Sequence, residues 1–246
     1  MRAMVLAAGL GTRLRPLTNG RPKALVGVAG HTLLEITLRR LASFGIREVI
    51  VNVHHFADMV VEYLRSNNNF GMRVEISHED VLLDTGGGLK KAAWFFLDDG
   101  GDSFILHNVD VISTVDLRQM IGLHSESGAL ATLAVQVRET SRYLLFDDHN
   151  QLCGRRAGRD GSPEMVRPAE GFKALAFSGV HVISTRMLGM MTEEGAFSIV
   201  NSYLRLSAQG ENIGAFPADR YYWRDLGKPE NVAQAARDVE AGIIHL

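Results

Sequence analysis

The chain has 246 residues, of which 46% are hydrophobic and 22% are charged, and its formal net charge is -2 at pH 7. These values are typical of a globular protein and argue against a disordered chain. Because there is no basic excess, nucleic acid and an anionic membrane surface are disfavoured as partners.

The first predicted element is a buried strand at Met4 to Ala8, a short apolar run that ends in glycines. The run is far too short to span a membrane. Gly, Thr and Arg follow it within a few residues, which is unlike a signal peptide. We therefore expect a cytoplasmic protein.

Strands and helices alternate through the first half of the chain. Apolar residues at helical spacing predict helices at 32–44, 56–64, 88–97 and 115–124, and short apolar runs predict strands at 48–53, 72–77 and 103–107. This alternation favours an α/β fold with a Rossmann-like, mostly parallel sheet and helices on both faces.

The second half breaks this rhythm. Strands are predicted at 129–137, 143–146, 174–183 and 213–216, and helices at 185–191, 197–209 and after Gly227. The strand at 143–146 is expected to pair with the region around Leu152 across a turn. The segment from Arg155 to Phe172 is rich in Gly, Pro and charge, which is typical of a long loop or flap.

A glycine-rich turn follows the first strand directly. Gly9 and Gly11 let a ligand approach the backbone, and successive N–H groups there can cradle a phosphate. A dinucleotide-binding loop would need Gly where Leu14 stands, and the turn lacks the Gly-Lys-Ser/Thr ending of a P-loop. The cations Arg13 and Lys23 suit a triphosphate instead, and a glycine-rich turn with solvated arginines is the alternative.

The stretch LAAGLGTRLRPLTNGRPKAL, residues 6–25, resembles the signature of the nucleotidyltransferases that act on sugar 1-phosphates. The resemblance implies two catalytic side chains, with Arg13 gripping the triphosphate and Lys23 neutralising the reacting phosphates. Arg suits the first role because its guanidinium binds phosphate oxygens in pairs, and Lys supplies a compact charge. The implied nucleotide contacts in this segment are Ala8, Gly9, Gly11, Thr12, Arg13 and Lys23.

A second segment, EDVLLDTGGGLK at residues 79–90, resembles the base-recognition loop of the same family. Asp84 stands where that family commonly has glycine. The resemblance implies a loop that lies flat against the base or ribose, although the segment alone is more typical of a plain strand-to-helix turn. The implied nucleotide contacts here are Glu79, Thr85, Gly86 and Gly87.

Two aspartates match the metal positions of the family. Asp110 follows a predicted strand, and Asp225 lies in the segment WRDLGKP. The resemblance implies that both bind Mg²⁺, a cation that prefers carboxylate oxygens, water and phosphates as ligands. For Asp225, a helix cap is the alternative. Zinc bound by His54, His55 and His78 is disfavoured, because these residues lack a regular ligand spacing.

The segment FSGV, residues 177–180, resembles the sugar-side strand of the family, with an ordinary core strand as the alternative. The implied sugar contacts are Asn108, Ser178 and Gly179. Because the segment from Arg155 to Phe172 lies between two strands placed on the sugar side, we expect it to be a mobile lid. A plain solvated surface loop is the alternative for that segment.

The resemblance covers nearly the whole chain and implies one domain, 1–246, with a nucleotide-binding half at about 1–125 and a sugar-binding half at about 126–246. The chain ends before the β-helix that longer members of the family append. In length and in the run LDTGGG it is most similar to the short bacterial N-acetylmuramate 1-phosphate uridylyltransferases. The short mannose 1-phosphate guanylyltransferases are close behind.

We therefore expect UTP and N-acetylmuramate 1-phosphate as substrates and Mg²⁺ as cofactor, in a monomer or homodimer. Mannose 1-phosphate or another hexose 1-phosphate is the alternative within this class. A non-catalytic nucleotide-sugar sensor is the alternative from another class, but a sensor would have no use for Arg13, Lys23 and both aspartates. A nicotinamide-dependent oxidoreductase is disfavoured by Leu14.

Overall fold

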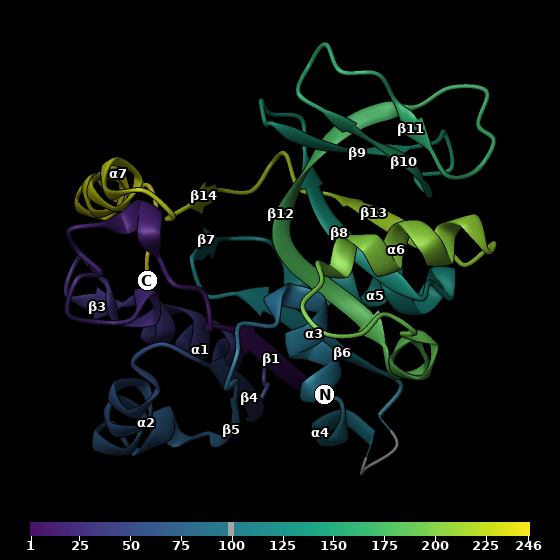
Figure 1. Cartoon of the computed structure of the whole chain (residues 1–246). Helices are drawn as coiled ribbons and strands as arrows, with labels where there is room; N and C mark the ends of the chain where they lie inside the picture. The colour runs from purple at the N-terminus through teal and green to yellow at the C-terminus, as the bar shows by residue number, and fades with distance from the viewer. Residues whose placement is uncertain (98–100) are drawn as a thin grey trace.

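The computed structural model describes residues 1–97 and 101–246, and one 10-stranded sheet runs through them (Figure 1). Its strands are β1 (Arg2–Leu6), β4 (Glu48–Val53), β5 (Arg73–His78), β6 (Ser103–Asn108), β8 (Ala131–Gln136), β9 (Arg142–Phe146), β10 (Leu152–Ala157), β11 (Glu164–Met165), β12 (Lys173–Ser184) and β13 (Ile213–Pro217). Their order is β11-β10-β9-β12-β6-β1-β4-β5, and β8 joins β12 and carries β13 on its other side.

Short ribbons and helices complete the described fold. The ribbons are β2 (Gly27–Val28) with β3 (His31–Thr32), and β7 (Val111–Ser113) with β14 (Trp223–Asp225). The α-helices are α1 (Leu33–Ser43), α2 (Ala57–Ser66), α3 (Asp84–Lys91), α4 (Trp94–Leu97), α5 (Leu117–Ser127), α6 (Ile199–Ala208) and α7 (Pro229–Glu240). The 3₁₀ segments are η1 (Thr12–Leu14), η2 (Lys23–Leu25), η3 (Asn68–Gly71) and η4 (Thr185–Met190).

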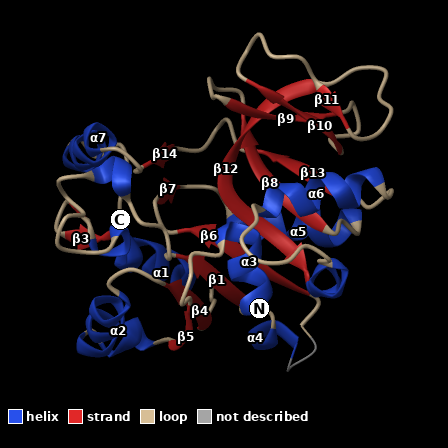
Figure 2. Ribbon diagram, viewed as in Figure 1, coloured by secondary structure: helices blue, strands red, loops and turns tan. Residues whose placement is uncertain are grey.

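The predicted Rossmann-like sheet is confirmed. Strands β6, β1, β4 and β5 pair in parallel, and helices lie on both of their faces (Figure 2). Beyond β6, the strands β12, β9, β10 and β11 pair antiparallel. This agrees with the expectation that the strand–helix alternation stops in the second half of the chain. Within the described ranges, no helix has the length and apolarity needed to cross a membrane.

Two buried apolar clusters cover the two faces of the sheet. Because successive side chains of a strand point to opposite faces, Val5 of β1 packs in one cluster and Met4 packs in the other. The cluster around Val5 includes residues of α1, α2 and α7, whereas the cluster around Met4 includes residues of α3 and α6. The carboxyl ends of the parallel strands are therefore held between two packed layers.

Strand β12 links the parallel strands to the antiparallel ones. Its residues 173–176 pair with β9, and its residues 180–184 pair with β6. Figure 1 shows it as a long curved strand that runs between the two groups. The change of partner occurs at Gly179, which has a φ of 74°. A Cβ there would lie 2.9 Å from Asn108 Nδ2 and 2.9 Å from Val111 Cγ2, so glycine is required on both counts.

The predicted helix at 88–97 is wrong in its bounds, because α3 begins at Asp84 and ends at Lys91, and α4 follows separately. The glycines of the predicted flat loop therefore lie in the first turns of a helix. Three contacts with the segment before α6 support this early start: Gly86 N–H and Gly87 N–H donate to Phe197 O at 2.9 and 3.4 Å, and Phe197 N–H donates to Leu83 O at 3.1 Å. Such tertiary hydrogen bonds offset the low helix propensity of glycine.

The prediction of one long loop from Arg155 to Phe172 is also wrong in part. Strand β10 continues to Ala157, and β11 pairs with it, with Arg155 opposite Glu164. Arg155 Nε lies 2.6 Å from Glu164 Oε2, and Arg167 Nη2 lies 2.9 Å from Asp147 Oδ2. Both arginines are therefore paired with carboxylates of this chain. That the segment from Arg155 to Phe172 acts as a lid stays a prediction.

Substituting Gly87 by alanine tests the close packing of α3. A Cβ at this position would lie 2.4 Å from the backbone oxygen of Gly195, so Gly87→Ala should lower the free energy of unfolding by ~1–3 kcal/mol. Gly122→Ala in α5 is the matched control, because a Cβ there meets nothing within 4 Å. It should raise the free energy of unfolding by up to ~1 kcal/mol. Urea titration of both variants measures the two changes, and equal effects would contradict the packing argument.

Candidate active site

The glycine-rich turn lies at the carboxyl end of β1, where α/β sheets place their ligand sites. Ala8 is buried, Gly9 and Thr12 are exposed, and Gly11 is partly exposed. Thr12 opens η1, so the turn continues into a single 3₁₀ turn rather than a long helix. The backbone N–H groups of Gly9 and Gly11 are thus placed at the edge of the sheet where a phosphate would approach.

Gly11 folds this turn back onto Lys23. Its φ is 64°, and a Cβ would lie 3.0 Å from Thr18 Cγ2 and 3.2 Å from Lys23 Cβ. Thr18 Oγ1 donates a hydrogen bond to Gly11 O at 2.8 Å, which closes the turn. A Cβ on Gly9 would lie 3.3 Å from Lys23 Nζ. The two glycines therefore allow the Lys23 side chain to lie beside the backbone that the phosphate is expected to contact.

A buried polar network joins the glycine turn to the second predicted nucleotide segment. Asn52, at 2% exposure, accepts a hydrogen bond from Ala7 N–H at 2.7 Å and donates one to Glu79 Oε1 at 2.6 Å. Glu79, at 1% exposure, also accepts from Leu83 N–H at 2.9 Å. The structure thus places Glu79 beneath the loop and gives its carboxylate backbone and side-chain partners. Sequence reasoning missed Asn52, because its partners lie far away in the chain.

Thr85, Gly86 and Gly87 lie in the first turn of α3 and contact the segment before α6. Thr85 Oγ1 accepts a hydrogen bond from Ile199 N–H at 3.0 Å. A Cβ on Gly86 would lie 2.2 Å from the Phe197 ring. The structure therefore explains these small residues by packing, and their contact with a nucleotide stays a prediction. Asp84 has a φ of 58°, which accounts for the glycine that the family commonly has there.

Lys23 and Asp110 form an ion pair at the centre of the site, with Lys23 Nζ 3.0 Å from Asp110 Oδ2. Asp110 follows β6 and is largely buried. Strand β14 lies alongside, because it pairs with β7 with Asp225 opposite Val111, and Leu226 N–H donates to Asp110 O at 2.7 Å. Residues from three distant parts of the chain thus meet at one place.

The two aspartates supply carboxylate oxygens, the ligands that a divalent cation prefers, and both lie on or next to the paired strands β7 and β14. In this structure Lys23 Nζ lies 3.0 Å from Asp110 Oδ2, and metal binding stays a prediction. In the part of the chain that the structure describes, no third His, Cys, Asp or Glu joins them in a cluster. Mg²⁺ is often bound by one or two carboxylates together with water and substrate phosphates, so a pair of aspartates suffices.

Arg13 lies at the far end of β14, against the backbone of Gly227. A Cβ on Gly227 would lie 2.6 Å from Arg13 Nη2 and 2.7 Å from Asp225 Oδ1. Gly227 N–H also donates to Asp225 Oδ1 at 2.7 Å. Glycine at position 227 therefore lets the guanidinium of Arg13 approach the Asp225 carboxylate closely.

The predicted sugar contacts lie on the neighbouring strands β6 and β12, and their contact with a sugar stays a prediction. Asn108 lies against Gly179, and Ser178 is fully buried between neighbours. Trp223 Nε1 donates to Ser178 O at 2.7 Å, which fastens β14 to β12. Trp223 was not among the predicted site residues, although it lies in the same short motif as Asp225.

Arg138 is a second missed residue. Its Cζ lies 3.7 Å from the centroid of the Trp223 ring, and its Nη2 donates to Phe177 O at 2.6 Å. Burial lowers the pKa of Arg138, and the nearby Asp225 partly opposes this. Arg138 was hard to find from the sequence, because it follows β8 without any motif.

Two buried histidines lie close to the site. Burial lowers the pKa of His107 to about 4 and that of His181 to about 3. His107 Nδ1 is 2.8 Å from Asn108 O, and His181 Nδ1 is 2.7 Å from Tyr203 Oη. Both imidazoles are therefore neutral near pH 7 and support the backbone and the core.

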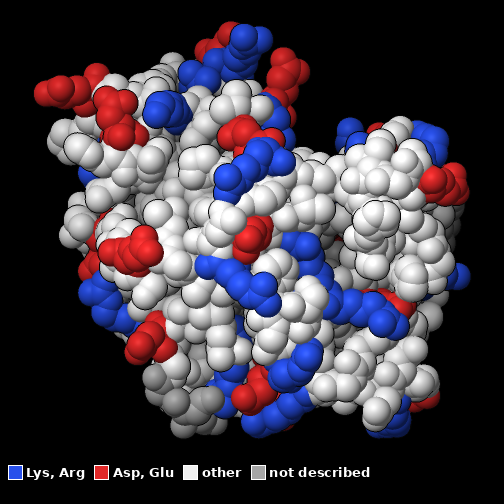
Figure 3. Space-filling model, turned by 180° about the vertical axis from the view of Figure 1, so that it is seen from behind, with Lys and Arg blue, Asp and Glu red and all other residues white. Residues whose placement is uncertain are grey.

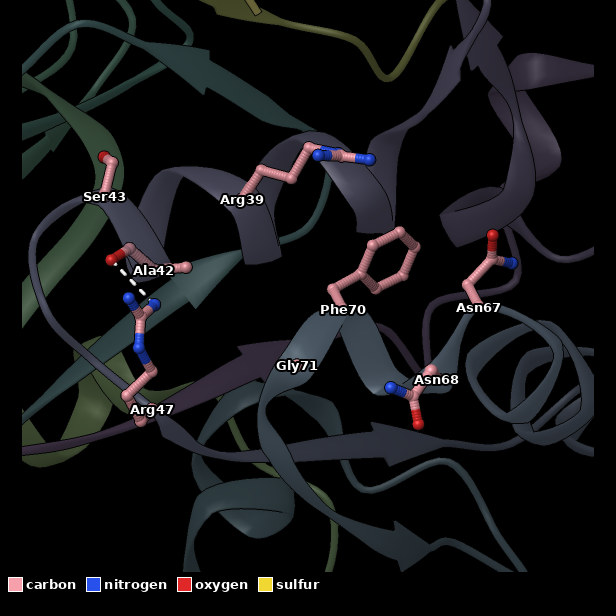
Figure 4. A pocket seen from close by; sticks show the side chains of 8 residues that line it. All are labelled: Arg39, Ala42, Ser43, Arg47, Asn67, Asn68, Phe70 and Gly71. Atoms are coloured by element: carbon pink, nitrogen blue, oxygen red, sulfur yellow. Dashed lines mark hydrogen bonds between the residues drawn. The ribbon is translucent and has the colours of Figure 1, made fainter.

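Surface features elsewhere do not coincide with this site. A pocket of about 480 Å³ lies on α1 and η3, and Figure 4 shows Arg39, Arg47 and Phe70 among its lining side chains. None of the predicted site residues lines it. On the face seen in Figure 3, basic side chains lie among acidic ones, as the net charge of -2 suggests.

Comparison with known proteins gives a family and several relatives. Residues 2–151 match the family described as nucleotidyl transferase. The N-acetylmuramate alpha-1-phosphate uridylyltransferase of Caulobacter vibrioides is 35% identical, over 97% of this chain and 97% of that protein. A mannose-1-phosphate guanylyltransferase of Mycobacterium tuberculosis is 27% identical over 98% of this chain, which spans 65% of that protein's length.

Among solved structures, HddC from Yersinia pseudotuberculosis complexed with GMP-PN is similar, with a TM-score of 0.76. The alignment covers 97% of this chain and 99% of that one, at 22% sequence identity. At this identity the likeness concerns the fold alone.

Replacing Asn52 by leucine tests the network under the two loops. Leucine keeps the approximate size but leaves Ala7 N–H and one oxygen of Glu79 buried without these partners, which costs about 1–3 kcal/mol each. Urea titration should therefore show a lower free energy of unfolding for Asn52→Leu. Asn201→Leu, at an exposed position of α6, is the control and should stay within ~0.5 kcal/mol of the wild type. An unchanged Asn52→Leu would refute the role of the network.

Proposed function

The chain belongs to the nucleotidyl transferase family and is a sugar-1-phosphate nucleotidyltransferase, and from this premise we propose that it joins UTP to N-acetylmuramate 1-phosphate. The observation that carries this reading is the pairing of Lys23 with Asp110 at 3.0 Å, beside Asp225 and at the end of the glycine turn. The choice of substrates is supported by the Caulobacter vibrioides relative, which matches this chain over 97% of both lengths.

The reaction is an in-line displacement at the α-phosphorus of UTP. A phosphate oxygen of the sugar 1-phosphate forms a bond to this phosphorus, and the bond from phosphorus to the oxygen that bridges to the β-phosphate breaks. The electron pair leaves on pyrophosphate. Because the attacking oxygen is already ionised at neutral pH, no side chain has to remove a proton, and catalysis comes from positioning and charge neutralisation.

The residues divide this work between them. The N–H groups of Gly9 and Gly11 bind the phosphates of UTP, as backbone amides in such turns do. Lys23 neutralises charge at the α-phosphate, and Arg13 binds the leaving pyrophosphate through its planar fork of donors. Neither role requires a covalent intermediate.

Asp110 and Asp225 would hold Mg²⁺. When bound, this ion supplies further charge neutralisation and orientation to the reacting phosphates. The carboxylates themselves orient the site, because Asp110 holds Lys23 and Asp225 accepts from Gly227 N–H. Both also lie on the paired strands β7 and β14 or next to them, which limits their movement.

A guanylyltransferase acting on mannose 1-phosphate is the second candidate, and the Mycobacterium tuberculosis relative favours it. That reaction would use the same Lys23, Asp110 and Asp225 of this chain. A nucleotide-sugar sensor is less well supported, because binding alone does not call for an ion pair of Lys23 and Asp110 at the reacting phosphates.

Pyrophosphate release measures the proposed activity. The enzyme is incubated with each of UTP, GTP, TTP, CTP and ATP and with N-acetylmuramate, mannose or glucose 1-phosphate in the presence of Mg²⁺. We expect the highest kcat/KM with UTP and N-acetylmuramate 1-phosphate, and loss of activity when EDTA removes the metal. Preference for GTP with mannose 1-phosphate would support the second candidate. No turnover with any pair would favour the sensor.

Lys23→Ala should lower kcat/KM by roughly 10²–10³, the scale on which one preorganised contact to a transition state acts. Lys91→Ala is the control, because Lys91 lies on α3, is exposed and is paired with Asp80 at 3.6 Å. Steady-state pyrophosphate release at saturating Mg²⁺ compares the two variants. If Lys23→Ala kept the wild-type rate, the catalytic role of Lys23 would be wrong.

A further inference from the structure

Strand β14 orders the charged groups of the site along one line. Arg138 stacks on Trp223 at its beginning, Asp225 lies at its end, and Arg13 lies against Gly227 two residues later. Trp223 comes two residues before Asp225 on this strand, and Gly227 comes two residues after it. Arg138 and Arg13 therefore each contact a residue that is two positions from the proposed metal ligand, one before it and one after it.

In-line displacement assigns a substrate to each direction. The attacking group and the leaving group stand on opposite sides of the α-phosphorus. In the proposed function, Arg13 and the glycine turn bind the leaving pyrophosphate. The sugar 1-phosphate is then expected on the side of β12, which Trp223 and Arg138 contact through Ser178 O and Phe177 O.

The guanidinium of Arg138 is held in place by the contacts that follow, and these contacts do not use all of its hydrogen-bond donors. Its ring partner is Trp223, and its Nη2 donates to Phe177 O at 2.6 Å. Its Nε is buried and has no hydrogen-bond partner among the described residues, while the side chain as a whole is partly exposed. A guanidinium has five N–H donors and stays charged in proteins, so its accessible N–H groups are suited to an anion that arrives with a ligand.

We propose that Arg138 recognises a carboxylate carried by the sugar of the sugar 1-phosphate, and so selects an acidic sugar over a neutral one. This inference rests on the proposed function. N-acetylmuramate differs from N-acetylglucosamine by a lactyl ether that ends in such a carboxylate. In the proposed function the phosphate of this substrate lies at the metal held by Asp225, and Arg138 lies beside Trp223 and Phe177, next to the β12 segment that carries the predicted sugar contacts. A planar guanidinium binds a carboxylate through two parallel hydrogen bonds.

A matched pair of substrates tests the assignment. N-acetylmuramate 1-phosphate and N-acetylglucosamine 1-phosphate are compared with UTP for the wild type, Arg138→Gln and Arg138→Lys. For Arg138→Gln we expect kcat/KM with the acidic sugar to fall by ~10–100-fold, mainly through KM, as for the loss of a charged hydrogen bond. With the neutral sugar, kcat/KM should change by less than about threefold on the same grounds. Arg138→Lys should restore part of the preference, because it restores the charge without the fork.

Controls separate recognition from folding and from the reaction itself. Arg186→Gln removes an exposed arginine that pairs with Glu211 and should leave both activities unchanged. An equal fall with both sugars in Arg138→Gln would overturn the inference, because Arg138 would then serve the phosphate or the fold. A wild type that prefers neutral sugars would overturn it while leaving the reaction class intact. A wild type with no turnover on any sugar 1-phosphate would instead refute the proposed function.

Discussion

The change of partner in strand β12 at Gly179 is the constraint on which the site depends. Before this residue the strand pairs with β9, and after it the strand pairs antiparallel with β6, the outermost of the parallel strands. Because the backbone at Gly179 has a φ of 74° and passes within contact of Asn108, a side chain cannot be accommodated there. The bend brings Gly179 against Asn108 at the end of β6, while the carbonyls of Phe177 and Ser178 accept hydrogen bonds from Arg138 and Trp223.

Electrostatics explains the composition of the site. The reaction joins two polyanions, so a protein with a net charge of -2 has to place its cations locally. Lys23 is neutralised by Asp110 in the ion pair, and Arg13 lies close to Asp225. These carboxylates limit the repulsion between neighbouring cations and hold them in position for substrates. Neutral buried histidines add no further charge, because their pKa values lie well below 7.

Small residues in the site serve close packing as much as ligand approach. Gly86 and Gly87 let α3 contact Phe197 and Gly195, which fastens α3 to the segment before α6. Gly11 lets the first turn lie on Lys23, and Gly227 makes room for Arg13. Glycine-rich motifs in this chain thus lie where two segments pack closely together, and only some of these positions are expected to contact a ligand.

Hydrophobic spacing was enough to predict the class of fold, because it reports local periodicity, and the alternation of strands and helices follows from it. The sequence also singled out Lys23, Asp110 and Asp225 as candidates, since each lies in a short recognisable motif beside a strand or a turn. The folded chain adds that β14 pairs with β7, that Asn52 and Glu79 join two loops, that α3 begins at Asp84, and that Arg138 stacks on Trp223. These features depend on contacts between residues far apart in the chain, and local spacing carries no record of such contacts.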